Sequence, residues 1–327
     1  MKDRQKILLI GLSTLVLGGL IIIFSTIGSV NLSLGDIFSA LINDNNKMVT
    51  TIVLGMRLPR NILAVLVGAN LAISGCLLQA VMKNPLSDPG ITGVSSGASV
   101  FAIIILLLLP QYTGILPLVA FIGGALACIV VYLMAWKNGL KAIRVVLAGV
   151  AVNAILGGFI SLLTTLYSDR IQGALLWLNG SLASKTWADV KLVAVYSLIG
   201  LSLSLLCIRG ANVLSLSDES ATNIGFNVNK TRVILSAVAV FLAATSTAIV
   251  GIISFVGLIV PHISRMIIGS DHKYAIPFSM VMGGIVLLVA DTVARTILGA
   301  LELPVGVVMS IVGGPFFLYL LRKKGDK

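Results

Sequence analysis

Few residues in this 327-residue sequence could support catalysis. Its two histidines, His262 and His272, have no carboxylate or thiol at metal-ligand spacing in the sequence, so we expect polar packing roles for both. The P-loop pattern G-x-x-x-x-G-K-[ST] is absent, so the chain cannot by itself cradle a nucleotide phosphate. Cys76, Cys128 and Cys207 lie inside apolar runs, where cysteine behaves as a small hydrophobic residue. We therefore predict that the protein is not an enzyme.

One carboxylate lies well inside an apolar run. Asp291, in the stretch LLVADTVARTI, is followed four residues later by Arg295, and residues at that spacing share one face of a helix. Ionisable side chains within a membrane are costly, and they are usually paired or functional. We expect the two to pair with each other near a membrane surface, with a functional role as the alternative. A single buried carboxylate disfavours transport driven by an ion gradient.

A polar stretch between two long apolar runs reads SLSDESATNIGFNVNKTR, at residues 215–232. Ser217 is a suitable N-cap, because its hydroxyl can accept a hydrogen bond from a free amide of a first helical turn. Asp218 and Glu219 follow at positions where negative charge suits the helix dipole. These three residues predict the start of a helix.

The same stretch also carries a helix stop. Gly225 can adopt the left-handed conformation that ends a helix, and Ala221 and Ile224 could form a small apolar face. A helix of about two turns is too short to be stable alone in water. We expect it to pack against another surface, with a solvated loop as the alternative.

The elements that position these residues are apolar helices. The composition is 57% hydrophobic and 11% charged, and apolar runs of about 18–25 residues, the length that crosses a bilayer, recur along the chain. The sequence thus predicts an all-α polytopic membrane protein, whose 33 glycines suit close helix packing in lipid. We place ten spans at residues 7–27, 58–82, 92–109, 115–136, 143–166, 192–208, 231–251, 253–268, 275–298 and 304–321.

The distribution of basic residues predicts the orientation. With ten spans both termini lie on one side, which then collects 16 of the 23 basic residues, whereas the other side receives seven. The positive-inside rule places both termini and residues 215–232 in the cytoplasm. Arg57 and Arg60 then lie outside, at the start of a span, where lipid-headgroup anchoring is one explanation. The net charge of +11 is spread over short connections, so nucleic-acid binding is not expected.

A weak internal similarity predicts an inverted repeat. Arg60-Asn-Ile-Leu aligns with Arg232-Val-Ile-Leu, and the first copy begins outside whereas the second begins inside. We therefore expect one transmembrane permease domain over residues 1–327. Its approximate repeat halves are 57–167 and 230–321, and 215–232 is a cytoplasmic coupling segment.

Five stretches in order along the chain resemble the FecCD family, the permease subunits of ABC importers. They are RLPRNILAVLVGANLAISGCLLQAVMKNPLSDPGITGVSSGAS (57–99), DESATNIGFNVNKTR (218–232), GIISFVGLIVPHISRMIIGSDHKYAIP (251–277), ADTVAR (290–295) and ELPVGVVMSIVGGPFFLYLLRK (302–323). The resemblance implies the type II importer permease fold with ten helices, in the cell membrane. It also implies a second permease subunit, cytoplasmic ATP-binding subunits that hold ATP and Mg²⁺, and an external substrate-binding protein. No cofactor is expected on this chain.

The resemblance also implies roles for particular residues. Arg57, Arg60 and Arg295 resemble external arginines that meet acidic residues of the binding protein, with Arg295 turned outward and Asp291 fixing its base. The implied contact with the ATPase is made by Ser217, Asp218, Glu219, Ala221, Ile224 and Gly225. The implied cytoplasmic gate of the transport path is the turn of Asn84, Pro85 and Leu86.

The implied substrate is an iron–siderophore complex, with haem or cobalamin as alternatives. Cobalamin-type relatives have small polar gate residues where this chain has Ala142 and Ile143. This difference disfavours cobalamin, and it leaves the identity of the gate residues at that point undetermined. An ion-coupled secondary transporter and a non-transporting membrane receptor are the rival classes. The sequence leaves open which chelate is carried, and whether the permease dimer is of identical or sister chains.

Overall fold

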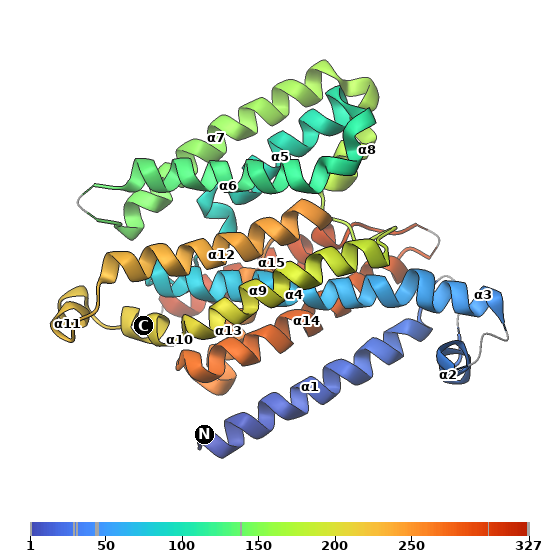
Figure 1. Ribbon diagram of the computed structural model, residues 1–327, viewed down its shortest axis with the longest axis horizontal. Coiled ribbons are helices and arrows are strands. Elements are labelled where there is room, and N and C mark those ends of the chain that lie inside the picture. Colours follow the sequence, from blue (N-terminus) through green and yellow to red (C-terminus); the bar gives the residue numbers. More distant parts are fainter. Residues whose placement is uncertain are drawn as a thin grey trace.

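The computed structural model describes residues 2–28, 30, 32–42, 46–137, 139–299 and 301–325, and the regular structure in these ranges is helical (Figure 1). Seven segments are long and apolar enough to cross a membrane. They are α1 (Asp3–Thr26), Lys47–Met82 with α4 (Leu58–Met82), Pro110–Ala135 with α6 (Leu116–Ala135), α7 (Ala142–Leu166), α9 (Trp187–Leu206), α12 (Val228–Val250) and α14 (His272–Thr296).

Three shorter apolar helices complete the set of ten predicted spans. They are α5 (Val94–Ile103) with its π-helical continuation to Leu108, α13 (Val256–Ile268) and α15 (Val305–Gly325). The break between α12 and α13 falls where the predicted spans 231–251 and 253–268 meet. Gly251 has φ +78° and Phe255 has φ +69°, so the backbone leaves the helical path at both positions. Pro261 lies within α13 and does not end it.

Short helices between the spans were not anticipated. They are α2 (Leu34–Ile42), α8 (Ile171–Leu178) and α10 (Ile208–Leu214), and the segment that contains α4 begins at Lys47, before the predicted span. A reading based on runs of about 20 apolar residues does not detect such elements, because they are too short to cross the bilayer.

α4 is the central helix, and most of its residues are buried. It approaches its neighbours closely where glycines face each other. A Cβ on Gly68 would lie 2.2 Å from the carbonyl oxygen of Gly283 in α14, and one on Gly75 would lie 1.8 Å from that of Gly257 in α13. Asn70 adds hydrogen bonds to Ser197 of α9 at 2.8 Å and to Ser246 of α12 at 3.2 Å. Small residues and interhelical hydrogen bonds thus hold the centre together, as is usual in lipid.

The predicted inverted repeat aligns the start of α4 with the start of α12. α4 and α12 run in opposite directions, so Arg60 and Arg232, each near the start of its helix, lie at opposite ends of the molecule (Figure 1). α1 begins and α15 ends at the end that carries α11 (Asp218–Asn223), whereas α2 and α3 (Lys47–Thr50) lie at the other end.

Candidate functional site

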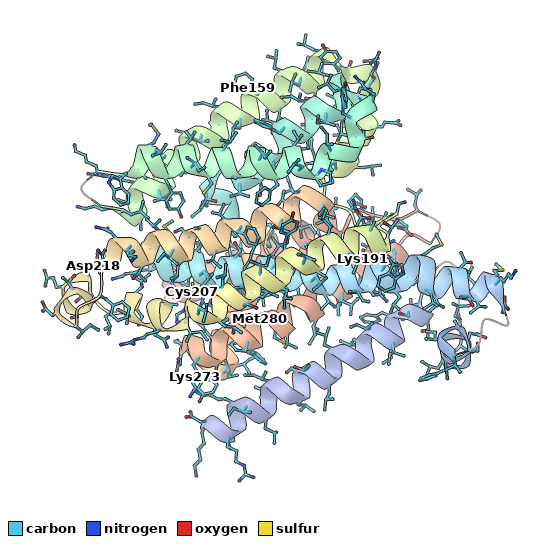
Figure 2. All side chains as sticks on the ribbon, viewed as in Figure 1. Phe159, Lys191, Cys207, Asp218, Lys273 and Met280 are labelled. Atoms are coloured by element: carbon cyan, nitrogen blue, oxygen red, sulfur yellow. The ribbon has the colours of Figure 1, made fainter. Side chains whose placement is uncertain are left out.

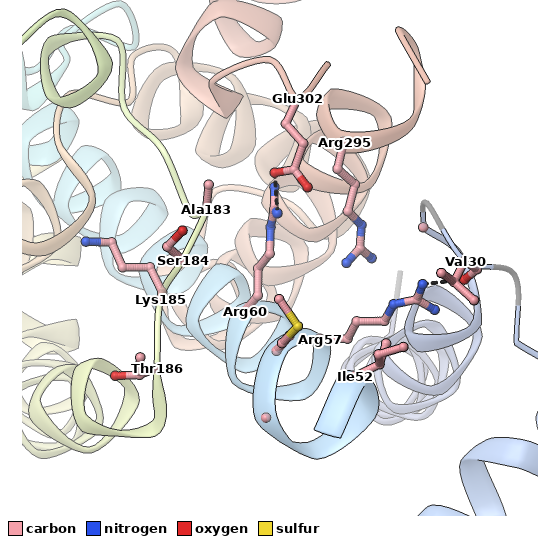
Figure 3. A pocket seen from close by; sticks show the side chains of 13 residues that line it. Val30, Ile52, Arg57, Arg60, Ala183, Ser184, Lys185, Thr186, Arg295 and Glu302 are labelled. Atoms are coloured by element: carbon pink, nitrogen blue, oxygen red, sulfur yellow. Dashed lines mark hydrogen bonds and ion pairs between the residues drawn. The ribbon is translucent and has the colours of Figure 1, made fainter. Parts of the chain in front are cut away.

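A cavity of about 480 Å³ opens beside the start of α4 (Figure 3). Its wall contains Arg57, Arg60 and Arg295, the three arginines for which the sequence implied a docking role, together with Lys185 and Glu302. These side chains come from the π-helical turn Thr51–Arg57, from α4, from α14 and from the loops before α9 and α15. The fold therefore brings most of the basic residues that the sequence placed on the outer side into the wall of one cavity.

Arg60 has two acidic partners. Its Nε and Nη2 donate to Asp291 Oδ2 and Oδ1 at 2.8 and 2.9 Å, and its Nη1 donates to Glu302 Oε2 at 2.7 Å. The expected pair between Asp291 and Arg295 is therefore wrong, because Asp291 takes the two-pronged guanidinium of Arg60 on the neighbouring helix. Sequence reasoning missed this pairing and the part of Glu302, since nothing in the sequence shows that α4 and α14 are adjacent.

The other two arginines bind backbone carbonyls at the end of α1. Arg57 donates to the carbonyl oxygens of Ser25 and Thr26, both at 2.9 Å, and Arg295 donates to that of Phe24 at 2.7 Å. The last carbonyls of a helix have no intrahelical partner, so these guanidinium groups satisfy them. Within the described part of the chain neither arginine forms an ion pair with a carboxylate.

The three arginines are buried, with exposures of 7% for Arg57, 8% for Arg60 and 5% for Arg295. Arg295 therefore does not turn outward as expected, because its guanidinium is held by the end of α1. Burial also argues against Arg57 and Arg60 as anchors in lipid headgroups. A partner could reach these groups only through the cavity, whose wall carries more positive than negative charge.

The predicted helix in the polar stretch is present as α11. Ser217 Oγ accepts a hydrogen bond from the amide of Ser220 at 3.1 Å, which confirms the N-cap. Gly225 has φ +84°, and the amide of Phe226 donates to the carbonyl of Ala221 at 3.1 Å, the pattern of a helix that ends at a left-handed glycine. Both ends of α11 therefore follow the local chemistry of the sequence.

The expected apolar face of α11 is not formed. Ala221 is 1% exposed and lies inward, where α11 packs against α10 and α12, whereas Ile224 is 60% exposed. Glu219 is also exposed. The outer surface of α11 thus presents Glu219 and Ile224, and Ala221 contributes to the packing of α11 on its own chain.

Asp218 joins α11 to two other elements. Its Oδ1 lies 2.8 Å from Lys83 Nζ, at the end of α4, and 3.0 Å from Arg232 Nη2, near the start of α12. The hydrogen bond from Lys83, with the charge of Arg232, lowers the pKa of Asp218 below its ordinary value. Lys83 Nζ also donates to the carbonyl of Leu216 at 2.6 Å. Sequence reasoning missed Lys83 and Arg232 as partners, because they are far from Asp218 along the chain or one helix away.

The turn proposed as a gate follows Lys83 directly. The backbone of Lys83 has the left-handed conformation, with φ +49°. Asn84 Oδ1 accepts a hydrogen bond from the amide of Leu86 at 3.0 Å, across Pro85. A side chain that binds its own backbone two residues on holds a tight turn. At the other predicted gate position α7 begins at Ala142, and the following residue, Ile143, is 64% exposed.

The family of the chain follows from comparison with known proteins. A model described as the FecCD transport family matches residues 14–323. The chain belongs to the FecCD family. This FecCD chain is 40% identical over 320 residues to the probable heme-iron transport system permease protein IsdF of Staphylococcus aureus (strain Newman), covering 98% of this chain and 97% of that protein. The corresponding protein of strain bovine RF122 / ET3-1 is 39% identical over the same length.

Two solved transporter structures have a fold similar to that of this chain. A transporter assigned to the metal-chelate type of ABC transporters, in an inward-facing conformation, superposes with a TM-score of 0.87 at 29% identity, over 96% of this FecCD chain and 99% of that chain. PsaBC from Streptococcus pneumoniae, in complex with Fab, shares the fold with a TM-score of 0.58 at 18% identity, over 88% and 95%. The FecCD chain is thus a multi-pass membrane permease with the expected type of fold.

The family also fixes the general activity. The FecCD chain is a transmembrane permease subunit of an ABC transporter complex and is not itself an ATPase. Among the described residues no group of three or more His, Cys, Asp or Glu side chains is placed to hold a metal ion.

Proposed function

We propose that this permease carries haem iron. The observation that supports haem is the 40% identity, along almost the whole of both chains, to a permease named for heme-iron transport. The siderophore substrate expected from the sequence has less support, because the relatives described above are named for haem and the solved neighbour only for metal chelates.

The arginine cavity is the proposed docking site for the binding protein on the outer face. Arg57 and Arg295 have no carboxylate partner in the described chain, and the half-buried Lys185 adds a further positive charge at the rim. A carboxylate from the binding protein that entered the cavity would meet positive groups already held in place by the end of α1. Complementary charge of this kind mainly orients and accelerates encounter.

The coupling segment is the proposed entry point for energy from ATP. Glu219 and Ile224 are exposed on α11 and available to an ATPase, which would bind ATP and Mg²⁺. Asp218 instead faces Lys83, which directly precedes the gate turn at Asn84. A movement of α11 would in this way be passed to the gate by an ion pair and not by the backbone alone.

The orientation and the assembly are part of the same proposal. Both termini and α11 are proposed to lie in the cytoplasm, in keeping with the basic residues at that end. A second permease subunit, identical or a sister chain, would cover part of the apolar surface that α7 exposes, on which Phe159 is 53% exposed (Figure 2).

The substrate is tested by uptake in bacteria that lack their own haem and siderophore importers. The permease is co-expressed with its ATPase and binding protein, and radioiron-labelled haem is compared with a labelled ferric siderophore. Uptake of haem that depends on all three proteins, and exceeds that of the siderophore, is the expected result. Uptake of the siderophore without haem would restore the original substrate expectation.

A further inference from the structure

A second cavity lies where two connections between helices are unwound. Its volume is about 220 Å³, and residues of α4, of the start of α5, of α12 and of the break between α12 and α13 form its wall. Leu71 on this wall lies near the middle of α4, roughly 16 Å from Met82 at 1.5 Å per residue. The cavity is therefore deep within a ~30 Å hydrocarbon core. We refer to it as the Asp88 cavity, after the carboxylate in its wall.

The charge of Asp88 is not balanced by a neighbouring side chain. Asp88 Oδ1 accepts a hydrogen bond from the amide of Gly90 at 2.8 Å, which caps the short helix that begins at Pro89. A carboxylate offers about four lone-pair sites, so this one amide leaves most of its capacity unused. Among the described residues Asp88 forms no ion pair, and no lysine, arginine or histidine lines the cavity. An unpaired carboxylate at this depth is costly, and such residues usually mark functional sites.

Hydroxyl groups from three elements share the wall with Asp88. They belong to Ser95 and Ser96 in the first turn of α5, to Thr247 in α12 and to Ser254 in the break after α12. Thr247 is only 3% exposed. The hydroxyl of nearby Thr245 donates to the carbonyl of Phe241 at 2.8 Å, as is common for a threonine within a helix. The hydroxyl of Thr247 makes no such bond to a described residue, and it is not sealed in by surrounding atoms. A buried hydroxyl without a partner that borders a cavity indicates a partner inside the cavity.

We propose that the Asp88 cavity binds one alkali-metal cation. The carboxylate of Asp88 would balance its charge, and the hydroxyl oxygens of Thr247 and of the serines in the wall would complete its ligands together with water. The unwound segment from Gly251 to Phe255 borders the cavity, and unwound backbone of this kind coordinates Na⁺ in other membrane transporters. A bound ion would join the segment that follows the proposed gate turn to α12, and so hold that segment in place.

The composition of the wall favours a monovalent ion over other occupants. Calcium and magnesium are held mainly by carboxylates and other oxygens, and the single carboxylate of the lining balances only one positive charge. No histidine or cysteine lines the cavity, so transition metals that prefer nitrogen or sulfur find no ligand there. The volume is also below the about 300–1,000 Å³ of typical small-molecule sites, which excludes an iron chelate. The inference does not depend on haem as the substrate or on which end of the molecule is cytoplasmic.

Equilibrium binding of radioactive cations to the purified full-length permease in nanodiscs tests the proposal. Sodium and rubidium ions, with rubidium standing in for potassium, are measured separately at constant ionic strength, with choline chloride replacing the other salt. The expected result is saturable binding of sodium or rubidium ions at one site per chain, and the preferred ion shows whether the site is sodium-like or potassium-like. Asp88→Asn keeps an oxygen for the amide of Gly90 but removes the charge, and should weaken binding by at least about tenfold. Thr247→Val removes the hydroxyl at similar volume and should weaken binding by about fivefold.

Asp169→Asn is the matched control, because it removes an exposed carboxylate outside the cavity and should leave binding unchanged. The absence of saturable binding of either ion, or equal binding in Asp88→Asn, would overturn the proposal. If Asp88→Asn does not fold, unchanged affinity in Thr247→Val overturns it instead. An infrared band of a protonated carboxyl group at neutral pH that disappears in Asp88→Asn would also overturn it, because a proton and not a metal ion would then neutralise Asp88.

Discussion

Lys83 Nζ lies 2.8 Å from Asp218 Oδ1, and the contact joins the end of the central helix α4 to the first residue of α11. Asp218 also forms an ion pair with Arg232, near the start of α12. One carboxylate thus ties the proposed coupling segment to the helix that leads into the proposed gate turn, and two predictions concern it.

Asp218→Asn is expected to weaken coupling while leaving the ATPase bound. The Asp218 side chain is half exposed, so the ion pairs are worth only about 0–1 kcal/mol to folding, and overall stability should change little. Uptake driven by ATP should nevertheless fall by up to about fivefold, the rate equivalent of 1 kcal/mol. Ile224→Arg is the counterpart, since it alters the exposed surface and should release the ATPase in co-purification. Loss of the ATPase from the Asp218→Asn variant would show that Asp218 contacts the ATPase directly and does not merely join α11 to α4.

The ion pairs of Asp218 should also be lost when the pH falls, because they require the ionised carboxylate. The pKa of Asp218 is lowered from 3.8 in the folded protein, so its contribution is complete above about pH 4 and is lost as the pH falls through the lower folded value. Hydrogen exchange of the amides of 216–226, corrected for intrinsic rates, should therefore stay protected from neutral pH to about pH 4. Asp218→Asn should remove the step below pH 4, and a step of equal size in that variant would contradict this assignment.

The two carboxylates on Arg60 are expected to differ in importance. The side chain of Asp291 is 1% exposed and that of Glu302 is 46% exposed. Asp291→Asn leaves a buried guanidinium with its main partner neutral, which should cost about 3–5 kcal/mol, whereas Glu302→Gln should cost about 0–1 kcal/mol. Thermal unfolding of the detergent-solubilised protein measures both. Equal losses of unfolding free energy in the two variants would show that burial does not decide how much each carboxylate contributes.

Docking at the arginine cavity is best tested at Lys185. Arg57 and Arg295 hold the end of α1, so replacing them would mix folding with docking. Lys185→Glu reverses a charge on the cavity wall without removing such a bond, and should slow association of the binding protein by about tenfold at low salt and less at high salt. Lys191→Glu, near the start of α9 but outside the cavity lining, is the matched control (Figure 2). Unchanged association kinetics in Lys185→Glu would count against docking there.

The sequence by itself determined the spans, the ends of α11 and the family. These depend on local properties: α4 covers the predicted residues 58–82 because a bilayer requires a run of that length, and α11 begins at Ser217 and stops at Gly225 because capping involves only near neighbours. Motifs spread along the chain were enough to indicate the FecCD family, because each is a short contiguous pattern.

Only the tertiary structure decided which charged groups meet. Asp291 shares a helix face with Arg295, but it binds Arg60, because the glycines at 68 and 283 let α4 and α14 approach closely. The burial of Ala221 and the pairing of Lys83 with Asp218 likewise depend on where α4, α10 and α12 lie in space. Helical periodicity specifies neighbours within one helix, whereas contacts between helices follow from packing that no local pattern encodes.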